Sequence, residues 1–143
     1  MSYVDYDLKV MDAQTAYTTA TALIYSASSV DIGNTGKYAD LGKGQPLAMK
    51  FAVTTAFAGT TGCLFTFQIR ADVDATIDAS SVILAESGPL GVASLTKGTI
   101  ITIPFPAGVQ GSTYDHIGAS VLTTVQNGSA GAVDAWIGFG DNS

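Results

Sequence analysis

The sequence contains one histidine, and any acid–base catalysis would be expected to use it. His116 directly follows Asp115, and a Ser-His-Asp triad would have to be built around this imidazole. Adjacent side chains on a strand point to opposite faces of the sheet, so Asp115 cannot orient His116 there. A single histidine without an activating motif is weak evidence for catalysis. We expect His116 to be an outward-facing strand residue, opposite Ile117 and Ala119, and a hydrolase centred on it is the alternative.

The densest acidic cluster suggests a metal site at first sight. Asp72, Asp74 and Asp78 follow one another within seven residues, and an Asp-x-Asp start is typical of calcium-binding loops. The EF-hand loop also needs glycine at its sixth position and glutamate at its twelfth. Here those positions hold Ile77 and Ile83. The cluster therefore fits a solvated connection better, and we expect no metal.

Cysteine and glycine usage also indicates no cofactor. Cys63 is the only cysteine, which excludes an intrachain disulfide and a thiolate cluster, and its apolar neighbours predict a core position. The glycine-rich stretches 41–46 and 86–91 lack the spacing of nucleotide-binding loops. We therefore expect no catalytic residue, no cofactor and no metal ligand in this chain, which is not an enzyme on this interpretation.

The composition instead favours a protein that works by contact. Only 13% of the residues are charged and the net charge is −6, whereas soluble domains typically carry about 25% charged residues. The basic residues are few and scattered, so neither nucleic acid nor an anionic membrane is an expected partner. No apolar run approaches the roughly 18 residues of a membrane span. A weakly charged surface predicts burial in an assembly, with the sparse charges on loops that face solvent.

Five residues are candidates for contact with a partner. These are Tyr3, Tyr6, Lys50, Arg70 and Trp136. Trp136 alternates with Ala135 and Ile137, so if those two face the core it points outward beside Asp134, where an aromatic ring is a typical interface anchor. The reverse assignment, with Trp136 in the core, stays open. An outward tryptophan also suggests a second function, a carbohydrate-binding β-sandwich module used in host attachment.

Short strands must position these residues, because apolar side chains recur with period two between glycine, asparagine and proline clusters. The predicted strands are 23–32, 47–54, 63–70, 81–85, 92–95, 99–103, 117–125 and 132–139. Residues 12–17 fit a short helix or an extended arm. We predict hairpins at the connection 58–62 and at Asn127-Gly128, where both residue types tolerate positive φ.

About eight short strands predict an all-β protein, an antiparallel sandwich of jelly-roll type. An immunoglobulin-like domain is less favoured, because its cysteine and tryptophan core signature is absent. Residues 1–22 differ in composition from the rest and predict an N-terminal arm that orders on contact with a partner. Residues 23–143 form the single predicted domain.

The order of features along the chain resembles a known family. The features are ValAspIleGly at 30–33, AspLeuGlyLysGlyGlnProLeu at 40–47, CysLeuPheThrPheGlnIle at 63–69 with a short acidic loop after it, a Lys-Gly turn before ThrIleIleThrIlePro at 99–104, ProAlaGly at 106–108, a strand led by Tyr114, and GlySerAlaGlyAlaValAspAlaTrp at 128–136. In this order they resemble the capsid cement, or decoration, proteins of tailed bacteriophages, typified by the Bordetella phage cement protein. The similarity runs from about residue 30 to the end.

The resemblance implies a structural virion protein. Its members decorate the outer surface of an icosahedral head, bridge neighbouring major capsid protein subunits of the HK97-like type and associate with copies of themselves as dimers or trimers. It implies capsid stabilisation without enzymatic activity, synthesis in the host cytoplasm and location on the virion surface. The uncharged threonine, serine, alanine and glycine surfaces are then expected to lie against sister subunits and the capsid.

Overall fold

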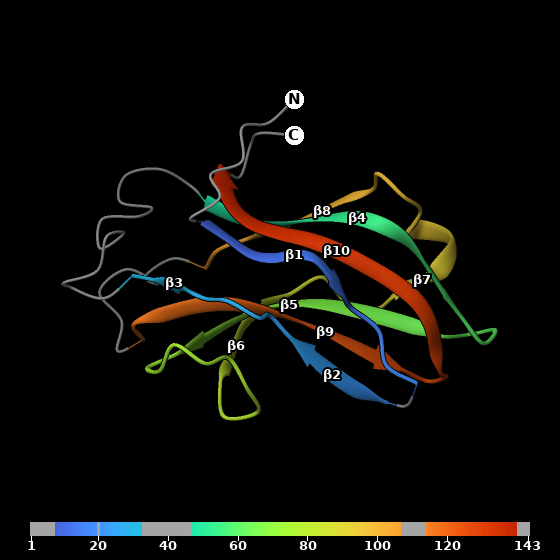
Figure 1. The fold of residues 1–143 in the computed structure, drawn as a ribbon, viewed down its shortest axis with the longest axis horizontal. Helices are drawn as coiled ribbons and strands as arrows, with labels where there is room; N and C mark the ends of the chain where they lie inside the picture. The colour runs from blue at the N-terminus through green and yellow to red at the C-terminus, as the bar shows by residue number, and fades with distance from the viewer. Residues whose placement is uncertain (1–7, 20, 33–46, 107–113, 140–143) are drawn as a thin grey trace.

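The chain folds into two antiparallel β-sheets packed face to face (Figure 1), in a computed structural model that describes residues 8–19, 21–32, 47–106 and 114–139. Sheet A has the strand order β1 (Lys9–Thr15), β10 (Gly128–Phe139), β4 (Leu47–Gly59) and β8 (Ile100–Pro104). Sheet B has the order β2 (Ala22–Tyr25), β9 (His116–Thr124), β5 (Leu64–Asp72) and β6 (Val82–Glu86). Two short strands extend sheet B, since β3 (Val30–Asp31) pairs with β9 and β7 (Leu90–Gly91) pairs with β5.

This strand order is that of a jelly roll, as the sequence predicted. Six of the nine connections between the described strands carry the chain from one sheet to the other, so strands that follow one another in sequence are seldom neighbours. Among the described strands, β5 and β6 alone are consecutive in the chain and paired with each other. Apart from the short strands β3 and β7, each sheet has four strands, and these two packed layers define the fold.

The two predicted hairpins are wrong, and the jelly-roll winding is the reason. Strands β4 and β5 lie in different sheets, and so do β9 and β10. Their short connections bridge the two layers and contact each other, because the Thr60 N–H donates to the Asn127 carbonyl at 2.9 Å. A side chain on Gly59 would come within 2.7 Å of that same carbonyl oxygen. The glycine and asparagine signals therefore mark tight chain reversals between layers rather than within one sheet.

Three further expectations need correction. Residues 92–95 were expected as a strand, yet Val92–Ser94 form the short 3₁₀ helix η2. The single strand expected at 23–32 is divided into β2 and β3. Residues 9–15, within the predicted arm, are strand β1, which pairs with β10 and buries Val10 and Met11 to 1% exposure each. This part of the N-terminal region belongs to the sandwich.

The core lies between the sheets and is built from the alternating apolar residues. Four phenylalanines form its centre, from β4 and β5. The Phe51 and Phe67 rings lie 5.0 Å apart and the Phe57 and Phe65 rings 4.7 Å apart, in tilted and edge-to-face arrangements. Each is at most 5% exposed, and full burial of such a side chain stabilises the fold by about 1.5–3 kcal/mol.

One glycine is required by this packing. Gly131 lies in the irregular first half of β10 with φ of 146°, and a Cβ there would come within 2.5 Å of the Phe57 ring. The absence of a side chain lets the ring fill the space between the sheets. Over the described ranges, no helix is long and apolar enough to cross a membrane.

Candidate functional site

The outer face of sheet B carries a buried polar network at its centre. Gln68 and Arg70 of β5 point away from the core, because Phe67 and Ile69, which alternate with them, point into it. Ser120 of β9 is directly opposite Gln68 in the register. Gln68 is 3% exposed, Arg70 4% and Ser120 0%. These polar groups are therefore as inaccessible as the apolar core.

Hydrogen bonds to neutral acceptors satisfy the Arg70 guanidinium. Its Nε donates to the Ser120 hydroxyl oxygen at 3.0 Å, its Nη1 to the Ser81 carbonyl at 2.9 Å and its Nη2 to Gln68 Oε1 at 3.1 Å. The Ser120 hydroxyl donates to the same Gln68 oxygen at 2.7 Å, and Gln68 Nε2 donates to Glu86 at 3.0 Å. The planar guanidinium thus joins β5 and β9 to the segment that begins β6, a task suited to its fixed fork of donors.

The ring of Tyr25 lies over Arg70 and completes its burial. The guanidinium carbon is 5.4 Å from the centre of the Tyr25 ring, a distance at which a cation attracts an aromatic face. Tyr25 is on β2, opposite Ser120 of β9. Arg70, predicted to contact a partner, therefore contacts residues of β2, β5 and β9 and the connection before β6 in its own sandwich.

The acidic residues after β5 organise their own connection. Asp72 accepts hydrogen bonds from the Ser81 hydroxyl at 2.6 Å and from the Asp74 N–H at 3.2 Å. Both hydrogen bonds lower the pKa of Asp72, and the bond from the Ser81 hydroxyl has the larger effect. Asp78 accepts from the N–H and hydroxyl of Ser80 at 2.8 and 2.6 Å. The carboxylates thus close the turn, and within the described ranges no group of three metal-binding side chains comes together.

His116 is partly buried on the outer side of sheet B, at the start of β9. As expected, Ile117 and Ala119 face the core, at 0% exposure. The His116 Nδ1 lies 3.5 Å from the Ser29 hydroxyl, at the limit of hydrogen bonding, while that hydroxyl donates to the Ala75 carbonyl at 2.7 Å. A nucleophilic serine must direct its proton to the imidazole, so this contact is not the arrangement of a catalytic triad.

A row of side chains crosses the outer face of sheet A. The register places Lys9, Trp136, Lys50 and Thr102 side by side on β1, β10, β4 and β8. Trp136 is therefore on the face opposite the core, as one of the two assignments predicted, yet it is only 6% exposed and Lys50 only 2%. A tryptophan this buried cannot stack on a sugar ring, which removes the main observation behind the carbohydrate-binding alternative.

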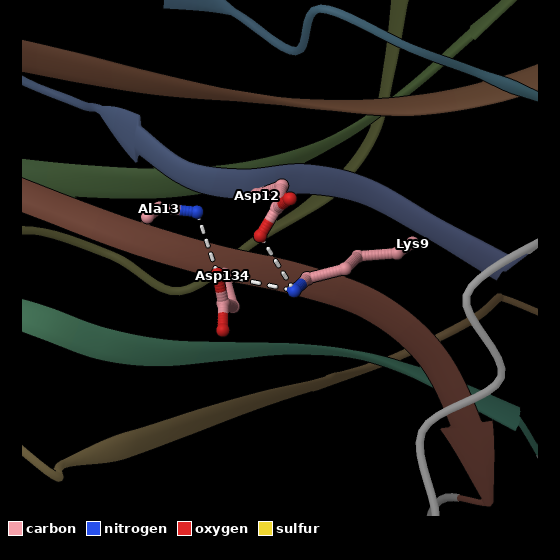
Figure 2. Close-up of polar contacts among 4 residues, drawn as sticks. All are labelled: Lys9, Asp12, Ala13 and Asp134. Carbon is pink, nitrogen blue, oxygen red and sulfur yellow. Dashed lines mark hydrogen bonds and ion pairs between the residues drawn. The ribbon is translucent and has the colours of Figure 1, made fainter.

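Lys9 ties β1 to β10 by an ion-pair cluster (Figure 2). Its Nζ lies 2.8 Å from Asp12 Oδ1 and 3.4 Å from Asp134 Oδ1. Asp134 also accepts the Ala13 N–H at 2.6 Å, and Ala13 has a positive φ of 46°. The bond to Asp134 supports this backbone conformation, which is rare outside glycine. The cluster therefore fixes the irregular edge strand β1.

A small hollow lies beside this cluster, between β1 and the segment after β2. Its volume is about 190 Å³. The lining residues are Lys9, Val10, Asp12, Gln14, Ala27 and Ser28. Pockets for drug-sized ligands usually have about 300–1,000 Å³, and Gln14 at its edge is already bonded to the Tyr25 carbonyl and the Ala27 N–H at 2.7 and 2.9 Å. This hollow is therefore smaller than a typical ligand site.

The exposed charges of the described residues are mostly negative. The expectation that the sparse charges lie on solvent-facing loops is wrong for Lys50 and Arg70, which are buried in strands, and Lys9 is paired. Lys97 is the exposed cation of the described part of the chain. The exposed carboxylates there are Asp12, Asp31, Asp74, Asp78, Glu86 and Asp115. Negative charge therefore dominates the exposed surface of the described residues.

Of the five predicted contact residues, the structure describes three, and all three are buried in the single chain. Trp136 and Lys50 are neighbours on the outer face of sheet A, whereas Arg70 lies on the outer face of sheet B, and Tyr3 and Tyr6 lie outside the described residues. Their role in contacts stays a prediction. Sequence reasoning missed the polar network around Arg70, although the alternation of Thr66, Gln68 and Arg70 with phenylalanines places all three on one face.

The fold places the chain in the class of jelly-roll sandwich proteins. The polar clusters of the described residues mainly join strands of this sandwich to one another. Within this class, the family model Bbp16 matches residues 10–137, and the chain belongs to the Bbp16 family. The family name suggests a phage-related protein. No curated protein matches the chain.

Proposed function

We propose that this protein is a capsid decoration protein of a tailed bacteriophage, which binds the outer surface of the head and cements neighbouring major capsid protein subunits of the HK97-like type. The observation that carries the proposal is membership of the Bbp16 family over residues 10–137. The order of turns and strands that resembles phage cement proteins supports the same function. On this proposal the protein is a structural component of the virion and not an enzyme, and it needs no cofactor.

The distribution of charge supports attachment to a basic partner surface. Four exposed carboxylates lie near one end of sheet B, where β3, β9 and β5 are in register: Asp31, Asp74, Asp78 and Asp115. Among the described residues, Lys50 and Arg70 are buried and Lys9 is paired, so Lys97 is the one exposed cation there. Complementary charge increases the rate and the specificity of association more than the affinity itself. Attachment to several subunits at once then makes modest contacts collectively tight.

Purified heads provide the direct test. Heads prepared without the protein should release their DNA at a lower temperature, and addition of the purified protein should restore the original temperature. Binding should weaken as salt is raised, because exposed charges are screened. Heads of equal stability with and without the protein, or a protein that does not bind heads at low salt, would show that the proposal is wrong.

Heads that carry a variant protein also test the alternative that the protein is a hydrolase. His116→Ala heads should be as stable as wild-type heads, because the hydrogen bond seen for the imidazole within the described residues is the marginal one to Ser29 at 3.5 Å. An ester- or glycan-hydrolysing activity that is present in the wild type and lost in His116→Ala would instead support a hydrolase.

A further inference from the structure

Strand β8 is an open edge of sheet A. It pairs with β4 on one side, and over the described residues no strand pairs with its other side. Natural sheets usually protect such edges with charged residues or with bulges. The segment Ile100–Pro104 has no charged residue, and its pairing with β4 continues without a register shift. Only Pro104, at its end, is a protective feature.

The backbone groups that face outward from β8 can be identified. The Val53 N–H donates to the Thr99 carbonyl and the Phe105 N–H donates to the Leu47 carbonyl, both at 2.9 Å. In an antiparallel pair, hydrogen-bonded residues alternate with residues whose backbone groups point the other way. Ile100 and Thr102 therefore direct both their N–H and their C=O groups away from β4. Pro104 offers a carbonyl alone.

Exposed apolar side chains lie on β8 and on β6, the outer strands of the two sheets. Ile100 on β8 is 48% exposed, and Val82 and Ile83 on β6 are 42% and 44% exposed. Strand β6 is the corresponding outer strand of sheet B and lies close to β8. These are three of the five large apolar residues that are exposed in the described part of the chain. The unpaired backbone edge of β8 thus carries an exposed apolar side chain, Ile100.

We propose that β8 pairs with the β8 strand of a second copy of this chain, in antiparallel orientation across a two-fold axis. The edge is complementary to itself, because Ile100 of one copy opposite Thr102 of the other matches each outward N–H with an outward C=O. Because β8 carries no charge, two copies of a net negative protein meet here without direct repulsion. The cross-strand neighbours also cover Ile100. The inference rests on the proposed function in so far as copies of a decoration protein associate on the head.

Two variants test this pairing in solution, by sedimentation of the purified chain over a concentration series. Thr102→Pro removes an N–H that β4 does not use, and proline is tolerated on an edge strand at such a position. Ile100→Lys places a charge on the edge. The matched control is Val73→Lys, a residue 56% exposed in the β5–β6 connection. Tryptophan fluorescence and circular dichroism check that each variant is folded.

We expect wild type and Val73→Lys to reach twice the monomer mass, and both β8 variants to raise the dissociation constant at least about tenfold. A monomeric wild type, or β8 variants that associate like wild type, would overturn the inference. If the wild type is monomeric and Ile100→Lys abolishes head binding, β8 takes an extended capsid segment and not a second copy. Head binding by a monomeric wild type would leave the decoration function standing, so the two proposals fail separately.

Discussion

Removal of the Arg70 side chain is the sharpest test of the buried polar network. Arg70→Ala deletes three hydrogen bonds from a charged donor and leaves the Ser81 carbonyl without its partner. Hydrogen bonds to charged groups contribute about 1.5–3 kcal/mol each, but they are not additive, and loss of the charge also removes its desolvation cost. Gln68 and Ser120 stay bonded to each other at 2.7 Å. We therefore expect a loss of about 3 kcal/mol in the free energy of unfolding.

Urea unfolding followed by the fluorescence of Trp136 measures this loss, since this single tryptophan is buried in the folded state. At a slope of about 2 kcal/mol per molar, the midpoint should fall by roughly 1.5 M. Arg70→Lys keeps the charge without the planar fork and should recover less than half of the loss. Lys97→Ala, the exposed control, should change stability by less than about 0.5 kcal/mol. Arg70→Ala within that same range, or Arg70→Lys equal to wild type, would refute the reasoning.

Three further predictions concern the core, acid stability and the thiol. Gly131→Ala should lower the free energy of unfolding by about 3 kcal/mol, because the new Cβ meets the Phe57 ring. The control Gly88→Ala, with φ of 79° and no atom within 4 Å of the new Cβ, should lower it by about 1 kcal/mol. Equal losses in urea unfolding would contradict this. The bonds that depress the pKa of Asp72 below 3.8 stabilise the fold above that pH, and this stability is lost as the pH falls through the lower folded-state pKa. Asp72→Asn should therefore be less stable at neutral pH and decline less steeply below about pH 4; an unchanged acid slope would count against it. Burial raises the pKa of the Cys63 thiol, so a thiol reagent should label it at least about tenfold faster in urea than in buffer, and equal rates would show an accessible thiol.

The sequence predicted the strands and their faces because alternation is a local property. Phe51 and Val53 of β4 and Phe65 and Phe67 of β5 face the core as their spacing indicated. The hairpins could not be predicted in the same way, because a tight reversal within one sheet and one between two sheets use the same residue types. Pairing is decided by which strands bury one another, and that choice depends on the whole chain.

The buried charges escaped prediction for a related reason. Alternation places Arg70 on the outward side of β5, and an outward arginine is usually exposed. Its burial comes from Tyr25 of β2 and from Ser81, which the β5–β6 connection brings back over the sheet. Tyr25 and Ser81 lie on other segments of the chain, so the alternation within β5 does not indicate that they contact Arg70. The same limit applies to Trp136, whose face was predicted and whose exposure was not.

The pairing of β1 with β10 has a consequence for how the protein folds. Sheet A needs residues 9–15 and 128–139 side by side, so the first described strand has no partner until the last one is available. Folds dominated by contacts between distant segments are slow, typically completing in milliseconds to seconds. Throughout that interval the apolar edge at β8 is also open to unintended partners. A shortened chain without β10 should therefore stay unfolded and aggregate. The native state forms only when β10 pairs with β1.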